Sequence, residues 1–225
     1  MSDSRLLMSE EILLIALDDE SGKTGFWYKP DTISAAAVCD LVDAGAITID
    51  EKKKVRPTGG VPGHPGLRVA YELVAANDKE RSVSHWVGVF NGKFSKTDGP
   101  VSRRLVADGV LSLEEGSLLR SARLRELDTG PERELRRRLA TVLVGGAEPD
   151  AHDAVLISML HTADMIVAAI AGEESADRRA GGKRAKAIQK ELKNNPLVKA
   201  QYDAVIAATI TSMAVAGAVI TAGSN

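Results

Sequence analysis

Five basic side chains recur at helical spacing towards the C-terminal end of the sequence. Residues 178–199 carry eight Lys or Arg residues against one acid, Glu191. At about 100° per residue, five of the eight fall within about 80° of one another on a helix, opposite Ala185, Ile188 and Leu192. Such a row can contact lipid phosphates, since each base contributes about 1 kcal/mol near an anionic bilayer. A solvated outer face on a core helix is the alternative interpretation. The five cations are Arg179, Lys183, Lys186, Lys190 and Lys193.

Aromatic residues gather in a second segment that could contact a membrane. Phe26, Trp27 and Tyr28 precede Lys29 in a turn-like stretch. Trp and Tyr favour bilayer interfaces because each has an apolar body and a polar tip. Trp27 is therefore a candidate membrane contact, with burial in the core as the alternative. Trp86 lies in a helix-like segment, where we expect it to be buried.

The sequence lacks the common catalytic motifs. It contains no HExxH, GxSxG, Walker A or GxGxxG pattern. His161 and Asp164 lie three residues apart on an expected helix, as a general base and its orienting carboxylate can. Because their neighbours are apolar, we interpret them as a satisfied polar pair in a helical core. We therefore expect no enzymatic activity, cofactor or metal; an enzyme with a ligand cavity near His161 is the alternative.

The composition indicates a globular helical protein in a reducing compartment. Apolar residues make up 44% of the chain and are mostly Ala, Leu and Val, of which Ala and Leu are the best helix formers. Cys39 is the only cysteine, so no intrachain disulfide can form. The N-terminus carries no signal-peptide pattern, and we expect a cytoplasmic protein. The uncharged stretch 204–223 is rich in small residues, which favours a core helix over a transmembrane helix.

Capping and turn residues predict where these side chains are held. Ser9, Glu10 and Glu11 mark the start of a buried helix, and Gly45 ends another that begins near Ser34. Further helices are expected from the loop at 57–66 to about residue 76, from Ser82 or Ser84 through Trp86, at 100–109, from Pro131 to Gly145, from Asp150 to about residue 171, at 183–194 and at 197–221. We expect a short strand at 46–49, a hairpin pairing 110–113 with 118–124 across 114–116, a loop at 91–99 and a linker at 173–182.

One helix–glycine–strand unit occurs twice. Residues 41–50 resemble residues 105–114, each with a helix end, a glycine and a short strand. Two copies of a common packing unit explain this pattern; two winged-helix-like units that bind nucleic acid are the alternative. The pI of 6.1 argues against nucleic acid as the partner. The arginines near the second unit are Arg103, Arg104, Arg120, Arg123 and Arg125.

A set of segments follows in a characteristic order and spacing at 7–22, 26–27, 41–50, 57–59, 83–86, 105–111 and 156–164. Together they resemble the Golgi phosphoprotein 3-like family, and residues 135–150 look like its bacterial-type members. Residues 7–22 look like the family's opening helix and acidic turn, and Phe26-Trp27 follows at the family's distance. Residues 41–50 resemble its first helix–glycine–strand unit, and residues 156–164 its late core helix. The segments 57–59, 83–86 and 105–111 are similar to later landmarks of the family.

The resemblance implies a mainly α, single-domain helical bundle with short β-hairpins over residues 6–222, after an N-terminal tail at 1–5. It implies peripheral binding to phosphatidylinositol 4-phosphate and, in eukaryotic members, capture of the cytoplasmic tails of Golgi enzymes. Trp27 matches the tryptophan of the family's lipid pocket, whereas Ser34, Ser95 and Asp98 stand where the family has arginines. The candidate head-group residues are Trp27, Lys29, Lys93, Lys96, Arg103 and Arg104.

We therefore expect an adaptor-like protein that binds anionic lipid on the cytoplasmic face of a membrane. Its expected partners are anionic phospholipid and the cytoplasmic tails of membrane proteins, and the hairpin offers a surface for oligomer formation. The candidate membrane-surface residues are Lys183, Lys186, Lys190 and Lys193 on the basic helix and Leu118 and Leu119 at the hairpin tip.

Overall fold

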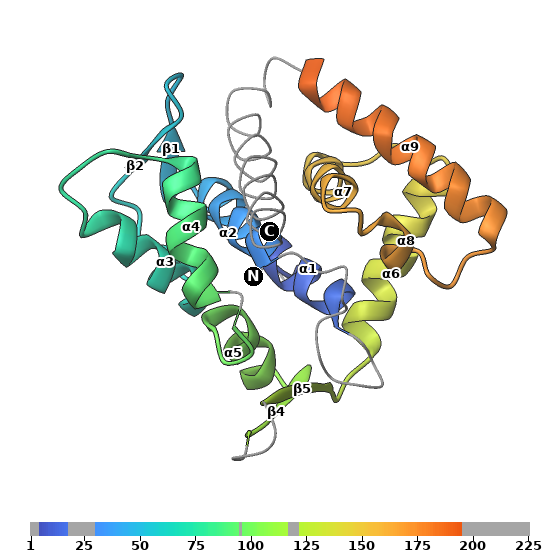
Figure 1. The fold of residues 1–225 in the computed structure, drawn as a ribbon, viewed down its shortest axis with the longest axis horizontal. Coiled ribbons are helices and arrows are strands. Elements are labelled where there is room, and N and C mark those ends of the chain that lie inside the picture. Colours follow the sequence, from blue (N-terminus) through green and yellow to red (C-terminus); the bar gives the residue numbers. More distant parts are fainter. Residues whose placement is uncertain (1–4, 18–29, 95, 117–121, 195–225) are drawn as a thin grey trace, which may run out of the picture.

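The protein is mainly α-helical, as the sequence predicts. The computed structural model describes residues 5–17, 30–94, 96–116 and 122–194. These residues form nine helices, a three-stranded antiparallel sheet of order β1-β2-β3 and a two-stranded sheet of β4 and β5. Figure 1 shows α2 to α5 on one side of α1 and α6 to α9 on the other.

Helix α1 (Met8–Ala16) lies at the centre, and all of its residues are buried. This agrees with the sequence, because the helix is apolar around most of its circumference. Its first turn is held by two carboxylates. Glu10 accepts a hydrogen bond from the amide of Leu7 at 2.9 Å, and Asp40 of α2 accepts from the amides of Met8 and Ser9 at 2.8 and 3.1 Å. The orphan amides of a buried helix end thus have partners.

Helix α2 (Pro30–Asp43) ends as predicted before Gly45, whose φ of +64° suits glycine. The expected first strand follows as β1 (Ile47–Ile49) and pairs with β2 (Lys54–Pro57), which pairs with β3 (Arg81–Ser82). The turn between β1 and β2 is closed by Asp50, which accepts hydrogen bonds from the amides of Lys52 and Lys54. Strands β2 and β3 were not predicted from the sequence.

Helices α3 (Pro65–Ala75), α4 (Val83–Phe94) and α5 (Pro100–Ala107) come next. The loop predicted at 91–99 is wrong in its first half, because α4 continues to Phe94. Trp86, Phe90 and Phe94 recur every four residues, and their ring centroids lie 5.9 and 5.0 Å apart inside the core. Burial of this aromatic row extends the helix through a polar sequence. Trp86 is buried as expected, at 3% exposure.

Strands β4 (Leu111–Glu114) and β5 (Arg123–Glu126) form the predicted hairpin in a different register. Leu113 pairs with Leu124 and Glu114 with Arg123, so the connection spans 115–122 rather than 114–116. This register buries Leu124 and lets Arg125 pair with the Glu114 carboxylate at 2.5 Å. Opposite charges across the strands favour it. The expected tip residues Leu118 and Leu119 lie outside the described residues.

Helices α6 (Gly130–Leu143), α7 (Ala151–Thr162), α8 (Ile166–Ala169) and α9 (Ser175–Asn194) complete the described chain. The continuous helix predicted over 150–171 is wrong. Asp164 has a φ of +61°, its amide donates to His161, and the amide of Met165 donates to Leu160. This left-handed helix stop is usually made by glycine, which the sequence does not supply here.

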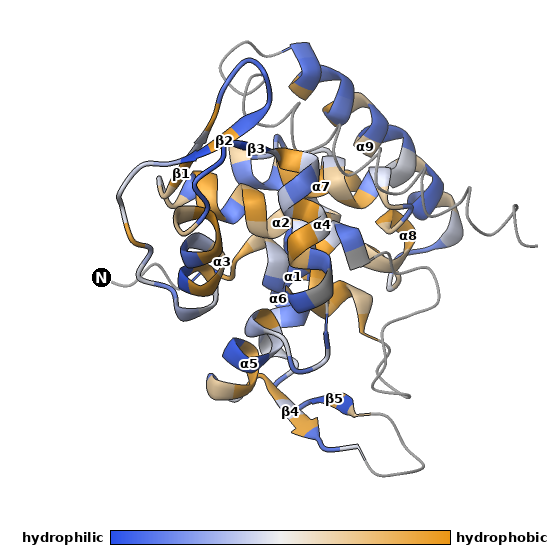
Figure 2. Cartoon of the chain, turned by 60° about the vertical axis from the view of Figure 1, so that its left-hand side comes forward, coloured by the Kyte–Doolittle hydropathy of each residue, from blue (hydrophilic) through white to orange (hydrophobic). Residues whose placement is uncertain are grey.

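The linker predicted at 173–182 is also wrong, because α9 begins at Ser175. Gly181 faces inward on α9, and a Cβ there would lie 2.6 Å from the end of the Ile170 side chain. The glycine therefore permits close packing between helices rather than marking a flexible connection. Figure 2 shows hydrophilic residues along the outside of α9 and hydrophobic residues at the centre of the molecule.

Candidate functional site

The basic row predicted on α9 lies on the exposed face of that helix. All five of its cations are exposed, whereas Gly181, Ala185, Ile188 and Leu192 are buried on the opposite side. Packing of α9 on α6, α7 and α8 fixes which side faces outward. At about 1.5 Å of rise per residue, the row is about 21 Å long. We call Arg179, Lys183, Lys186, Lys190 and Lys193 the α9 basic row.

The α9 basic row is not neutralised by the described part of the chain. None of its side chains forms an ion pair with a described carboxylate, whereas the neighbouring Arg184 binds Glu148 at 2.9 Å. Like charges three and four residues apart cost a helix about 0.2–0.5 kcal/mol per pair. An anionic group placed against the row would relieve this repulsion.

Of the four candidate head-group residues that the structure describes, only Arg103 and Arg104 share a pocket. Arg103 and Arg104 on α5 line one pocket of about 250 Å³ beside α3, and neither Lys93 nor Lys96 lines it. Those two lysines are exposed at the end of α4 and in the turn that follows. Trp27 and Lys29 lie outside the described residues.

The family's arginine positions hold no cation here. Ser34 is fully buried within α2, so it offers no surface contact to a head group. Asp98 is exposed and lies 3.8 Å from the Arg103 guanidinium. Ser95 lies outside the described residues. The cations near these positions in the sequence are Lys93, Lys96, Arg103 and Arg104, and none of them stands at a matched position.

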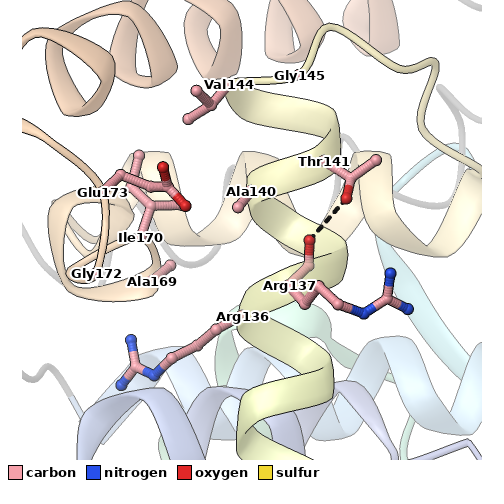
Figure 3. Close-up of a pocket in the computed structure, with 10 residues that line it drawn as sticks. All are labelled: Arg136, Arg137, Ala140, Thr141, Val144, Gly145, Ala169, Ile170, Gly172 and Glu173. Carbon is pink, nitrogen blue, oxygen red and sulfur yellow. Dashed lines mark hydrogen bonds between the residues drawn. The ribbon is translucent and has the colours of Figure 1, made fainter.

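A larger pocket of about 480 Å³ lies between α6 and the segment that joins α8 to α9 (Figure 3). Its cationic side chains already have partners. Arg136 binds the Glu132 carboxylate and the carbonyl of Ala168, and Arg137 binds Glu134. Neither His161 nor Asp164, the candidate catalytic pair, is among its lining residues.

A charged network around the start of α1 is the main feature that sequence reasoning missed. The buried Glu11 carboxylate binds Arg138 of α6 at 2.5 Å and His152 of α7 at 2.7 Å. The adjacent Glu10 faces His64, the residue before α3, at 3.1 Å. Two carboxylates inside an apolar helix were the available signal, but nothing in the sequence identified partners more than 50 residues away.

Burial perturbs the acid–base chemistry of this network. Burial raises the pKa of Asp40 to about 7, and the hydrogen bonds from Ser9 and Met8 oppose this only in part. For His152, burial lowers the pKa, but the hydrogen bond and charge of Glu11 outweigh burial and leave it raised. Because these groups hold α1 against α2 and α7, we assign the network to stability.

The described residues offer neither a metal-binding cluster nor a membrane-spanning helix. In the described ranges, no group of three or more His, Cys, Asp or Glu side chains is placed to hold a metal ion. Across those same ranges, no helix combines the length and apolar content needed to cross a bilayer.

Comparison with known proteins identifies the family. The model of the Golgi phosphoprotein 3 (GPP34) family matches residues 8–209, which is most of the chain. A search of curated proteins finds no match. The matched range contains α1 to α9 and both small sheets, in agreement with the order of segments recognised in the sequence. The chain belongs to the Golgi phosphoprotein 3 family.

Proposed function

We propose that this protein docks peripherally on anionic membrane surfaces, with the α9 basic row as its main contact. The observation that carries the proposal is the row itself: five exposed cations in one line on a helix whose other face is fixed in the core. Family membership supports the same reading, because Golgi phosphoprotein 3-like proteins are lipid-associated.

The row suits a flat charged surface. Five bases at about 1 kcal/mol each give up to about 5 kcal/mol near an anionic bilayer, which is a partition gain of roughly a few thousandfold. Its close neighbours on the outer face are small, since Ala180, Gly182 and Ala187 flank the cations. With no large apolar side chain between the cations, the contact is electrostatic adsorption rather than insertion into the acyl region.

The lipid and the protein partners that we propose next rest on family membership. We propose that the head groups include phosphatidylinositol 4-phosphate or a chemically similar phospholipid and that binding takes place on the cytoplasmic face. The candidate head-group residues are Trp27, Lys29, Lys93, Lys96, Arg103 and Arg104. In this proposal the protein is an adaptor rather than an enzyme, and it binds the cytoplasmic tails of membrane proteins.

Sedimentation with vesicles tests the proposal. Binding is measured on phosphatidylcholine vesicles with and without phosphatidylserine, at low and physiological salt. We expect binding only to anionic vesicles and a steep loss with salt, because the screening length falls from about 30 Å at 0.01 M to about 8 Å at physiological ionic strength.

A matched pair of double variants ties the binding to the row. Lys186→Glu/Lys190→Glu should abolish sedimentation, whereas Lys52→Glu/Lys79→Glu should retain it with the same change in net charge. Lys52 and Lys79 are exposed and lie far from α9 in the sequence. Equal losses in both variants would refute the role of the row. A gel shift with duplex DNA at low salt, combined with no vesicle binding, would replace the membrane by nucleic acid.

A further inference from the structure

The pocket beside α5 combines an apolar floor with a cationic edge. It has a volume of about 250 Å³ and lies where α3 and α5 meet. Pro65 and Pro100, each at the start of its helix, both line it, so two helix N-termini open beside the same cavity. The positive ends of both helix dipoles are therefore close to any ligand held there.

Close backbone packing shapes this pocket. Gly66 of α3 is buried, and a Cβ there would lie 3.4 Å from the carbonyl oxygen of Pro100 and 3.3 Å from the His64 ring. The amide of Gly66 donates to Nδ1 of His64 at 3.2 Å. The wall of the pocket is thus held by packing and a helix cap.

Two arginines form the edge of the pocket, and both can exchange their present partners. Arg103 lies 3.8 Å from Asp98, and the two side chains are 72% and 58% exposed. Arg104 lies 2.8 Å from Asp108, one turn along α5. Exposed pairs of this kind contribute about 0–1 kcal/mol, so a phosphate that engages a guanidinium through two parallel hydrogen bonds can displace the carboxylate. No carboxylate lines the pocket.

The remaining lining is apolar and partly open to solvent. Val69 of α3 is 41% exposed, which is high for a large hydrophobic side chain of this protein, and Ala107 of α5 also lines the pocket. A volume of 250 Å³ is smaller than the roughly 300–1,000 Å³ of sites that enclose drug-sized ligands. It holds only part of a ligand, with the rest outside.

We propose that this pocket is a subsite for a phosphomonoester joined to an apolar chain, as in phosphatidic acid. A phosphomonoester carries about −1.5 to −2 charges at neutral pH, which matches two arginines better than a single carboxylate does. The phosphate binds Arg103 and Arg104, and the first carbons of the ligand cover Val69. This inference rests on the proposed function, since it names a lipid class for a membrane-docking protein.

Titration with soluble probes tests the subsite without a membrane. Dihexanoyl phosphatidic acid, dihexanoyl phosphatidylcholine and inorganic phosphate are each added below micelle formation, and the NMR signals of the Val69 methyl groups and the arginine Nε–H groups are followed. We expect saturable shifts with phosphatidic acid and none with phosphatidylcholine. Inorganic phosphate should shift the arginine signals with at least about tenfold weaker affinity, because burying three or four CH₂ groups contributes that much or more.

Variants separate the two halves of the subsite. Arg103→Gln/Arg104→Gln should weaken phosphatidic acid by about tenfold or more, since each charge-assisted hydrogen bond lost is worth that order. Arg103→Lys/Arg104→Lys should recover only part of the loss, because lysine cannot bind phosphate through two parallel bonds. Val69→Ser should weaken phosphatidic acid and leave inorganic phosphate unchanged. Arg68→Gln, exposed on α3 outside the pocket, is the matched control.

The outcomes distinguish this subsite from the α9 basic row. Lys186→Glu/Lys190→Glu should leave the phosphatidic acid titration unchanged, so loss of vesicle binding by that variant together with an unchanged titration separates the two sites. Equal affinities for phosphatidic acid and inorganic phosphate would overturn the amphiphile subsite in favour of a simple anion site. Absence of shifts at Val69, or equal loss in Arg68→Gln, would overturn it altogether.

Discussion

Replacing Asp40 by Asn should change how the stability of this protein depends on pH. The Asp40 carboxyl is 3% exposed and accepts the first two amides of α1. Burial raises its pKa from 3.8 to about 7. Between these values the folded protein holds a proton on Asp40 and the unfolded chain does not. The contribution of this group to stability is therefore full below about pH 4 and is lost as the pH rises through 7.

The size of the effect follows from linkage. From about pH 5.5 to about pH 8, ionisation of Asp40 should lower the free energy of unfolding by about 2 kcal/mol, because each pKa unit of difference corresponds to about 1.4 kcal/mol. Asn cannot ionise, and its side-chain oxygen can still accept one of the two amides. The stability difference between wild type and Asp40→Asn should therefore shift by about 2 kcal/mol in favour of the variant over this range.

Urea unfolding followed by circular dichroism at several pH values measures this difference. Asp43→Asn is the control, since Asp43 is exposed on the same helix. Groups that do not interact with Asp40 titrate alike in the proteins compared and cancel in the difference. Parallel pH profiles for wild type and Asp40→Asn would show that Asp40 is ionised throughout, and the assignment of burial as the dominant cause would then be refuted.

Two further changes test the packing of α7 and α9. His152→Gln should lower stability most below pH 6.5, the ordinary pKa of histidine. The loss should become smaller as the pH rises through the raised pKa of His152, because wild type then loses its charged pair with Glu11 as well. Urea unfolding at several pH values measures this, and a loss that does not depend on pH would contradict it. Gly181→Ala should lower the free energy of unfolding by about 1–3 kcal/mol, because its Cβ overpacks against Ile170. Gly182→Ala has open space at its Cβ and should raise the free energy of unfolding by about 0.5–1 kcal/mol. Thermal unfolding of both variants checks the contrast, and equal shifts would refute it.

Local signals predicted much of the fold because they act within a few residues. Gly45 ends α2 in the left-handed conformation, Pro100 and Pro131 lie in the first turns of α5 and α6, and Asp150 caps α7 by accepting from Asp153. Each of these residues satisfies or removes a backbone group that it contacts directly. Their structural meaning is therefore visible in a short stretch of sequence.

The errors arose where tertiary packing decides local structure. Asp164 adopts a conformation that glycine usually takes, and Gly181 lies inside a helix where it permits contact with Ile170. In both cases the sequence signal points the other way, and at Gly181 the contact with Ile170 of a neighbouring segment determines the result. The start of α1 shows the same limit, since Glu11 meets Arg138 and His152 only after the halves of the fold come together.

The sequence predicts only the part of the candidate site that lies on a single helix. The α9 basic row could be predicted because one helix holds all of its members and the helical period alone puts them on one side. The pocket beside α5 could not, because it exists only where α3 and α5 pack together.

The α9 basic row is preorganised by the packing of its opposite face. Ile188 and Leu192 are buried against the rest of the bundle, and Gly181 lets the first half of α9 approach closely, so the backbone orientation of the cations is set before any partner arrives. A basic tail of the same charge would lose about 1–2 kcal/mol of backbone entropy per residue ordered on binding. In α9 this backbone entropy is already lost when the protein folds. Adsorption is then opposed mainly by the entropy that the cationic side chains lose when they become ordered. Repulsion between the cations is stored in the free protein and is relieved when anionic groups approach. For the docking that we propose, the fold thus presents a modest number of bases as one preorganised cationic surface.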